Sequence, residues 1–584
     1  MEVQLDISQC VPRMAFEGAR TFPLNNTSLF YSESFHKSPS SSHSRFYSIP
    51  PSEKAHTKPP TILVYTGDNS KLFEQIFETL SSMLPSDTYT IFHLSREALR
   101  LHPWISRETA CLMLTDTESL DDEAWRKLHQ YFDHSGKMLF ICQNDLLATF
   151  SNGKFSRKSS KILKLAFGEK QSIALGKDLE DFLKKAFRMV AKHKELFSDA
   201  VLILYLESSS QQAGAIFSDA SCSKLFTGGE SLIADAFSRL SIETVHNLPM
   251  PSLSTGYFLC SYDRLPWDMK GMKFNEEFGS SPKFIIKQLE KHGELQKPTN
   301  TLCPVEYRTR NSGIPEFDAD IYFRTLQTSK IGRGVMFFPV CSSTQDLARS
   351  LASAMPTEPL VVIAKQQTKG KGRSGNQWLS PIGCAMFSFN YAIPSGTPLA
   401  DNVGFIQHIL CVALVNGICS LHGLQDFPLR IKWPNDIYYR RSFKMGGLLV
   451  NGSTSGDQMI CTLGAGLNVA NKKPTVCIND MLEGYSNVKI TVEEFIANAL
   501  NKFEYYVDIF QTKGREAFLK HYYDAWLHSR EEVELSETGE KVVIRGLDEH
   551  GFLEVRSRQN GRIMILHPDG NTFDMMKGLI SVKY

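Results

Sequence analysis

The spacing of apolar and polar positions predicts an α/β region between residues 59 and 265. Apolar runs at 61–65 and 137–142 alternate with segments such as 121–132, whose apolar residues recur at helical spacing. Strands that alternate with helices are typical of a parallel sheet covered on both faces. Further strands are expected at 89–94, 111–114, 201–205 and 257–260, and helices around 73–80 and at 178–197.

A second region, residues 316–530, combines buried strands with longer apolar helices. The apolar runs 334–340 and 360–364 predict buried strands. The run 405–421 is short for a membrane span and is interrupted by polar residues, so it predicts a buried helix that Gly423 ends. Helices are also expected at 491–510, which opens with a Thr-x-x-Glu capping pattern, and at 516–527.

One short stretch places a lysine on the open face of a strand. Between residues 427 and 433, apolar residues occupy every second position, and Lys432 falls between them. This period of two predicts a half-buried strand with Lys432 facing outward. Pro434 and Asn435 then predict a turn, and 436–439 a return strand.

The last segment, residues 531–584, changes to short strands separated by turn pairs. Thr538-Gly539, Asn560-Gly561 and Asp569-Gly570 mark the turns. The pattern predicts a small β-barrel. Its strands are expected at 541–545, 552–555, 562–566 and 579–583.

Length and composition predict the domain boundaries, and the net charge argues against one class of function. The chain has 584 residues, too many for one domain, and a net charge of +1, which does not favour bulk binding to nucleic acid. Residues 1–58 are rich in Ser, Pro and His and predict disorder, whereas the charged, turn-rich residues 266–315 predict a linker. The segmentation gives five parts: 1–58, 59–265, 266–315, 316–530 and 531–584.

The twelve cysteines lack metal-ligand spacing and predict reduced thiols in an intracellular protein. We expect a cytoplasmic location. The acidic residues Glu2, Asp6 and Glu17 do not favour a mitochondrial transit peptide, although organelle delivery stays open. No membrane attachment is expected.

The strongest candidate chemistry lies in a glycine-rich basic loop at 367–381. Gly370, Gly372 and Gly375 alternate with Lys371 and Arg373. Glycines let the backbone approach a ligand, and successive N–H groups in such a loop form an anion site. The loop lacks the spacing of a Walker A motif. By itself it is equally consistent with a solvated basic turn.

Five motifs in this order resemble the biotin–protein ligases, called holocarboxylase synthetases in eukaryotes. They are SSTQ at 342–345, QTKGKGRSG at 367–375, KWPND at 432–436, KMGGLLV at 444–450 and GAGLNV at 464–469. The resemblance implies a multidomain α/β and α+β chain. Its expected parts are an amidotransferase-like parallel sheet, a biotin/lipoate-ligase-like catalytic domain with a mixed sheet, and a C-terminal SH3-like β-barrel.

The resemblance also implies the reaction. Biotin and ATP would form biotinyl-5′-AMP, with Mg²⁺ accompanying ATP, and the biotinyl group would pass to a lysine of the biotin carboxyl carrier domains of carboxylases. Mg²⁺ is expected to be held by phosphates and waters, and no protein ligand for it is assigned. A lipoate–protein ligase and a non-catalytic regulator that binds biotin or the adenylate are the alternatives.

Site residues follow from the motifs. Lys432 and Arg373 are the expected catalytic residues, because cations must offset the repulsion between the biotin carboxylate and the α-phosphate. The implied biotin-binding residues are Ser343, Thr344, Gln345, Gln367, Lys371, Gly372, Arg373 and Lys432. The implied ATP- and adenylate-binding residues are Gly370, Lys371, Gly372, Arg373, Trp378, Lys432, Asn435, Gly447, Asn468 and Lys583.

Several of these residues keep a structural interpretation. Ser343, with Asp346 three residues later, could simply cap a helix. Trp378 could pack under the loop, Lys444 could be a surface lysine, and Asp436 could cap a turn. Cys142 ends a predicted strand but lacks the flanking glycines of a nucleophile elbow, so we interpret it as structural.

Overall fold

The computed structural model describes residues 59–143, 201–218, 230–260, 283–287, 302–308 and 313–582, apart from short gaps inside these ranges. The predicted disordered segment 1–58, the predicted helix 178–197 and Lys583 lie outside the described residues.

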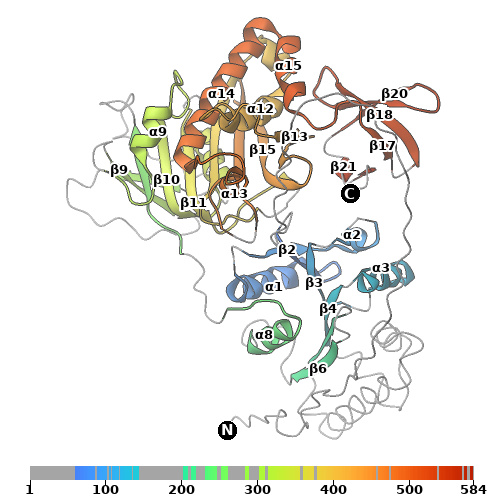
Figure 1. Cartoon of the computed structure of the whole chain (residues 1–584). Helices are drawn as coiled ribbons and strands as arrows, with labels where there is room; N and C mark the ends of the chain where they lie inside the picture. The colour runs from blue at the N-terminus through green and yellow to red at the C-terminus, as the bar shows by residue number, and fades with distance from the viewer. Residues whose placement is uncertain are drawn as a thin grey trace, which may run out of the picture. The chain divides into compact units, whose positions relative to one another are not determined.

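The N-terminal sheet has the strand order β2-β1-β3-β4-β5-β6 (Figure 1). The strands β1 to β4 run parallel, as predicted, whereas β5 and β6 add to the edge in antiparallel pairs. Their bounds are β1 (Thr61–Tyr65), β2 (Thr90–His93), β3 (Thr109–Leu114), β4 (Lys137–Gln143), β5 (Val201–Glu207) and β6 (Gln212–Ser218).

Both faces of this sheet are covered, as the alternating pattern predicted. Ile62 of β1 faces a core formed with α1 (Ser70–Met83) and α8 (Glu230–Arg239). Its neighbour Leu63 faces the opposite core, which includes α2 (Arg96–Leu101) and α3 (Asp122–Asp133). Successive strand residues alternate between the two cores because side chains alternate across a strand.

The catalytic sheet is larger than the sequence predicted. Its order is β13-β14-β15-β16-β12-β11-β10-β7-β9-β8, with parallel and antiparallel pairs. The bounds are β7 (Gly256–Cys260), β8 (Lys283–Lys287), β9 (Leu302–Arg308), β10 (Gly334–Cys341), β11 (Val361–Gln367), β12 (Cys384–Pro394), β13 (Leu429–Lys432), β14 (Asp436–Tyr439), β15 (Phe443–Ser455) and β16 (Gln458–Asn468).

Two predictions are corrected here. The strand at 257–260 was assigned to the N-terminal sheet, but β7 pairs with β10 of the catalytic sheet. The segment 266–315 was predicted to be a linker, but it contains β8 and β9, which extend the same sheet beyond β7. These pairings join segments far apart in the chain, and local spacing carries no information about such partners.

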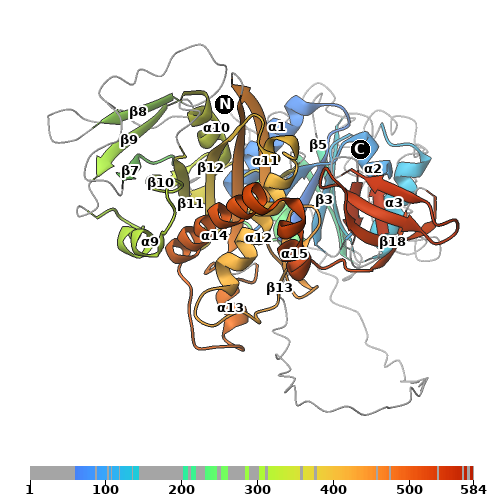
Figure 2. The same cartoon turned by 90° about the horizontal axis from the view of Figure 1, so that it is seen from above.

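Helices cover the two faces of the catalytic sheet unequally. The helices α12 (Phe405–Cys419) and α14 (Val492–Lys513) pack on one face, and α10 (Thr344–Ala354) packs on the other, over β10 to β12 (Figure 2). The remaining helices are α9 (Ala319–Thr325), α11 (Pro398–Asp401), α13 (Ile478–Leu482) and α15 (Arg515–Ala525).

The predicted helix starts and ends are partly confirmed. Thr491 caps α14, because its side chain accepts a hydrogen bond from the backbone N–H of Glu494 at 3.1 Å. The helix α12 is buried as predicted, but it ends at Cys419 with Ser420 as its C-cap, before Gly423. Among the described residues, no helix is both long enough and apolar enough to cross a membrane.

The C-terminal strands form a sheet of order β20-β19-β18-β17-β22-β21. Val533, Val542 and Leu553 belong to the same apolar core as α12 and α14. The SH3-like β-barrel stays a prediction. The bounds are β17 (Glu532–Leu535), β18 (Glu540–Leu547), β19 (Leu553–Ser557), β20 (Ile563–Leu566), β21 (Asn571–Asp574) and β22 (Leu579–Val582); β17 and β21 were not predicted.

Candidate functional site

Sheet register brings the predicted motifs to one level of the catalytic sheet. Lys432 pairs with Asp436, and Asp436 pairs with Gly447 on the next strand. Gly447 pairs in turn with Gly466, which pairs with Met386. Segments more than 60 residues apart therefore lie at a similar level on neighbouring strands. The strand β11 ends nearby at Gln367, where the glycine loop begins.

A buried polar cluster lies where β10 passes into α10. Gln367 Oε1 accepts hydrogen bonds from the backbone N–H of Thr344 at 2.8 Å and from its hydroxyl at 3.2 Å. The Gln367 amide donates to Ser380 Oγ at 3.0 Å. The Gln345 amide donates to Asn451 Oδ1 and to the carbonyl of Thr462, both at 3.0 Å. The structure thus brings together the predicted residues Thr344, Gln345 and Gln367.

Two oxygen atoms of this cluster are buried without a hydrogen-bond partner. They are Ser343 Oγ, whose residue is 0% exposed, and Gln345 Oε1, whose residue is 5% exposed. Buried polar groups are almost always paired, because an unpaired one keeps its full desolvation penalty. Two unpaired oxygens from residues two positions apart in the chain indicate a place for a polar ligand.

The capping interpretation of Ser343 is wrong. Its hydroxyl accepts no hydrogen bond, and Asp346 instead forms an ion pair with Lys371 at 2.8 Å. The glycine loop thus places a cation beside the first turn of α10.

Glycines make the space that this cluster occupies. A Cβ on Gly464 would lie 2.1 Å from Gln345 Oε1, and one on Gly466 would lie 2.5 Å from the ring of Trp378. Real Cβ contacts are never this short, so any side chain at these positions would displace Gln345 or Trp378. The Trp378 backbone N–H also donates to the Gly370 carbonyl at 2.9 Å. This placement fits the interpretation that Trp378 packs beneath the loop.

The glycine loop runs from the polar cluster to the KWPND turn. Its first residues are anchored by backbone hydrogen bonds from Thr368 to Cys341 and from Lys369 to Ser342. At its other end, Arg373 Nη1 donates to Asn435 Oδ1 at 3.4 Å. Gly372 lies between the two cations, half-buried. Residues 374–377, including Gly375, lie outside the described residues.

Lys432 occupies the half-buried outer side of β13, as the alternation predicted. Leu429 and Ile431 point into the core, while Arg430 and Lys432 face outward. The Lys432 ammonium lies 5.5 Å from the centroid of the Tyr438 ring, which provides a cation–π contact.

A second lysine lies in the same region. Lys444 Nζ forms an ion pair with Asp436 at 2.7 Å, and both side chains are more than two-thirds buried. Gly447 leaves room for this pair, because its Cβ would lie 3.1 Å from Asp436 Oδ1. Lys444 is therefore part of the basic region rather than an isolated surface lysine. The Asp436 carboxylate binds the Lys444 ammonium, so its role is more than to cap the turn.

The other predicted residues are placed as follows. Asn468 is buried at the end of β16, opposite Cys384. Asn435 donates from Nδ2 to the Leu448 carbonyl, which ties the KWPND turn to β15. Among the described residues, no group of three or more His, Cys, Asp or Glu side chains could hold a metal ion.

Sequence reasoning missed the polar residues that support the cluster from the strands. Ser388 Oγ lies 2.9 Å from Thr344 Oγ1, and Asn390 accepts a hydrogen bond from the Thr462 hydroxyl at 2.8 Å. Both lie among the first seven residues of β12, all of which are buried. A useful signal was present: polar side chains at alternate positions of an otherwise apolar strand face a common polar partner.

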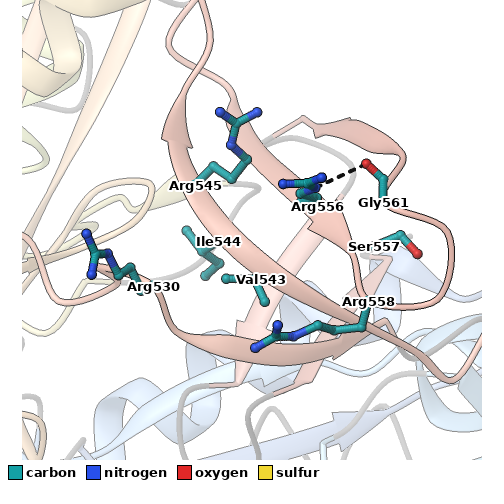
Figure 3. Close-up of a pocket in the computed structure, with 8 residues that line it drawn as sticks. All are labelled: Arg530, Val543, Ile544, Arg545, Arg556, Ser557, Arg558 and Gly561. Carbon is teal, nitrogen blue, oxygen red and sulfur yellow. Dashed lines mark hydrogen bonds between the residues drawn. The ribbon is translucent and has the colours of Figure 1, made fainter.

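A separate pocket of about 480 Å³ lies on the C-terminal sheet (Figure 3). Arg530, Arg545, Arg556 and Arg558 line it, and none of the predicted site residues does. Arg545 and Arg558 already form ion pairs, with Glu554 and Glu532. This pocket is therefore distinct from the predicted site.

Comparison with known proteins identifies the class. Residues 337–468, which carry the polar cluster, the glycine loop and the KWPND turn, match the model of the Biotin/lipoate A/B protein ligase family.

Individual relatives are biotin–protein ligases rather than lipoate ligases. The biotin–protein ligase of Homo sapiens is 29% identical over 570 residues, covering 90% of this chain and 78% of that protein. Biotin–protein ligase 2 of Arabidopsis thaliana is 34% identical over 314 residues, covering 51% of this chain and 93% of that protein. A solved biotin protein ligase from Aquifex aeolicus, in complex with biotin and ATP, is 22% identical in sequence. The match covers 40% of this chain and 98% of that chain, with a TM-score of 0.30.

The chain belongs to the biotin–protein ligases. It is an ATP-dependent ligase, as the motifs implied.

Proposed function

We propose that the chain activates biotin as biotinyl-5′-AMP on the α10 face of the catalytic sheet and transfers it to a lysine of a carboxylase carrier domain. The observation that carries this proposal is the pair of unpartnered buried oxygens, Ser343 Oγ and Gln345 Oε1. They lie at one end of a glycine loop whose other end reaches the basic KWPND turn.

The buried end suits the ureido ring of biotin. That ring offers two N–H donors and one carbonyl acceptor. Gln345 Oε1 can accept one N–H, and the Ser343 hydroxyl can donate to the carbonyl. The Gln345 amide group is held by Asn451 and Thr462, so its oxygen keeps a fixed direction. Binding would remove two unpaired polar atoms, which favours a ligand with this donor and acceptor pattern.

The basic end suits the carboxylate and the phosphates. Lys432 would bridge the biotin carboxylate and the α-phosphate, and Arg373 would contact phosphate oxygens with its planar guanidinium. Lys371, Gly370 and Gly372 would add to the anion site formed by the loop. Asn435, Gly447, Asn468, Trp378 and Lys583 would line the nucleotide.

With these cations offsetting the negative charge of the two substrates, the reaction proceeds in two steps. The biotin carboxylate attacks the α-phosphate of ATP, the mixed anhydride forms and pyrophosphate leaves. A lysine amine of the acceptor then attacks the biotinyl carbonyl, forms the amide and expels AMP. Mg²⁺ would accompany ATP and neutralise phosphate charge, held by phosphate oxygens and water. Closure of the loop would shield the adenylate from hydrolysis.

The remaining parts of the chain and its location are also matters of proposal. We infer an amidotransferase-like N-terminal domain that regulates the ligase or contacts the acceptor, a C-terminal SH3-like barrel, and a cytoplasmic location.

Calorimetric titration of biotin tests the proposed ring site. Gln345→Met keeps the volume but removes the fixed oxygen, and we expect the Kd for biotin to rise roughly tenfold or more, as for other lost buried hydrogen bonds. Gln559→Met, at an exposed turn of the C-terminal sheet, is the matched control and should leave the Kd unchanged. Equal affinity of Gln345→Met and the unaltered chain would remove Gln345 from the site.

A further inference from the structure

The segment after α15 lies against the strand that carries Lys432. The Leu527 N–H donates to the Ile431 carbonyl at 2.9 Å, and Trp526 forms a parallel bridge with Ile431. In the described sheet order, β13 is the last strand, so this segment covers its outer edge. The ladder alongside Lys432 is therefore continued by a piece of chain that leads into the C-terminal sheet.

At Trp433, two residues after Ile431, the hydrogen-bond acceptor is a histidine ring instead of a backbone carbonyl. The Trp433 N–H donates to His528 Nε2 at 3.1 Å. A backbone N–H can only donate, so Nε2 must be the acceptor and must carry no proton. The ring hydrogen then lies on Nδ1, which donates to Glu531 Oε2 at 2.8 Å. The two contacts together define a neutral imidazole of one tautomer.

The ring is held firmly from its far side. His528 is 0% exposed, and Arg441 hydrogen-bonds to the second oxygen of Glu531. The chain of contacts therefore runs from Arg441 through Glu531 and the imidazole to the peptide that joins Lys432 to Trp433.

We propose that His528 is a positioning residue for Lys432, fixing the Lys432–Trp433 peptide so that the ammonium is held where the carboxylate and the α-phosphate meet. This role rests on the proposed function of Lys432. Without the ring, a buried N–H would lose its acceptor and the strand end would be released just before Pro434. A displacement of about 1 Å at a reacting group can cost roughly a hundredfold in rate.

The surrounding charges keep the ring neutral. The groups that face it are Glu531, Arg441 and Lys432. Burial lowers the pKa of His528 below its usual 6.5, and the two cations lower it further, while Glu531 opposes them. Protonation would put a hydrogen on Nε2, facing the Trp433 N–H. The positioning role is therefore intact near neutral pH and is lost as the pH falls through the lowered pKa.

Three variants of the full chain separate positioning from folding. His528→Gln keeps an acceptor oxygen near the place of Nε2, whereas His528→Leu fills the space without one. Arg530→Ala is the matched control, because Arg530 lies in the same turn but lines the pocket of Figure 3. The readouts are kcat and KM in biotin-dependent ATP–pyrophosphate exchange.

We expect kcat of His528→Leu to fall roughly 10- to 100-fold, with the KM for biotin changed less than about threefold. His528→Gln should recover most of this loss, and Arg530→Ala should match the unaltered chain. Unchanged kcat in His528→Leu would overturn the role. If the unaltered chain shows no exchange, the proposed function fails, which is a different result.

Should His528→Leu fail to fold, two measurements on His528→Gln and the unaltered chain decide. The acid loss of kcat should move or disappear in His528→Gln, since its amide does not titrate. Long-range ¹H–¹⁵N spectra of ¹⁵N-histidine-labelled chain should show one resonance, missing in His528→Gln, with an unprotonated Nε2 at neutral pH. An identical pH profile in both chains, or a protonated Nε2, would contradict the proposal.

Discussion

The two ends of the candidate site are built differently. At the ring end, Ser343 and Gln345 are 0% and 5% exposed, and the fixed side chains around them come from four strands and a helix. At the phosphate end, the Lys371 side chain is 48% exposed and Arg373 reaches Asn435 through one long hydrogen bond.

This contrast indicates a division of labour. A rigid buried cluster with unpaired atoms selects a ligand by hydrogen-bond pattern, because a wrong ligand leaves those atoms unpaired. Cations on a glycine loop, one exposed and one half-buried, supply charge that becomes effective only when the site closes and excludes water. Recognition of biotin should therefore fail when the buried end is altered, and activation of biotin should fail when Lys432 of the basic end is altered.

The largest effect is expected at Lys432. Lys432→Ala should lower kcat of biotin-dependent pyrophosphate exchange about a thousandfold, as for the loss of a preorganised charge at a reacting group. The chain should stay folded, because the side chain faces out of the core. Arg430→Ala, two residues earlier on the same side of β13, should change kcat less than about threefold. Equal losses in the two variants would point to strand damage instead.

Acid pH should lower the stability of the folded chain through a buried histidine. His408 is fully buried, with its Nε2 2.9 Å from the Gly551 carbonyl oxygen, and its pKa is lowered to about 4, mainly by burial, with Arg373 adding to the effect. The folded chain then binds fewer protons than the unfolded chain between pH 6.5 and about 4. The free energy of unfolding should be complete above pH 6.5 and fall by about 3 kcal/mol toward pH 4.

Urea unfolding followed by tryptophan fluorescence measures this loss. His408→Gln should flatten the pH dependence, because the amide does not titrate. A slope unchanged by that substitution would show that other groups control acid stability.

A single methyl group added at Gly464 would occupy space in the buried polar cluster. Gly464→Ala would press against Gln345 Oε1, and we expect the Kd for biotin to rise roughly 10- to 100-fold, from about 1–3 kcal/mol of overpacking. Gly452→Ala is the matched control, since a Cβ there meets nothing within 4 Å. Equilibrium titration with biotin compares the two, and tight binding by Gly464→Ala would show that the cluster is not the ring site.

The loop should affect retention of the product more than its formation. Arg373→Gly should still release pyrophosphate, within about tenfold of the unaltered rate, but the adenylate should escape and label lysines of bystander proteins. Mass spectrometry of a mixture with serum albumin measures this leak. Labelling confined to the carrier domain would contradict closure of the loop over the adenylate.

Much of this arrangement could be predicted from sequence, because it depends on local spacing. The alternation around Lys432 predicts the orientation of its side chain, and the buried run 360–364 predicts the strand that leads to Gln367. The contribution of β7, β8 and β9 could not be predicted, because strand partners are chosen by distant surfaces. The role of Asp346 was missed for a related reason: a lysine 25 residues later competes for the carboxylate that would otherwise cap the helix.

The most direct test of the account is ATP–pyrophosphate exchange by the purified full chain with biotin, lipoate or octanoate as the only acid. The account predicts exchange with biotin alone, since the unpaired oxygens of Ser343 and Gln345 match a ureido ring and neither of the other acids carries one. Exchange with lipoate or octanoate at a comparable rate would contradict the claim that this buried cluster selects the substrate.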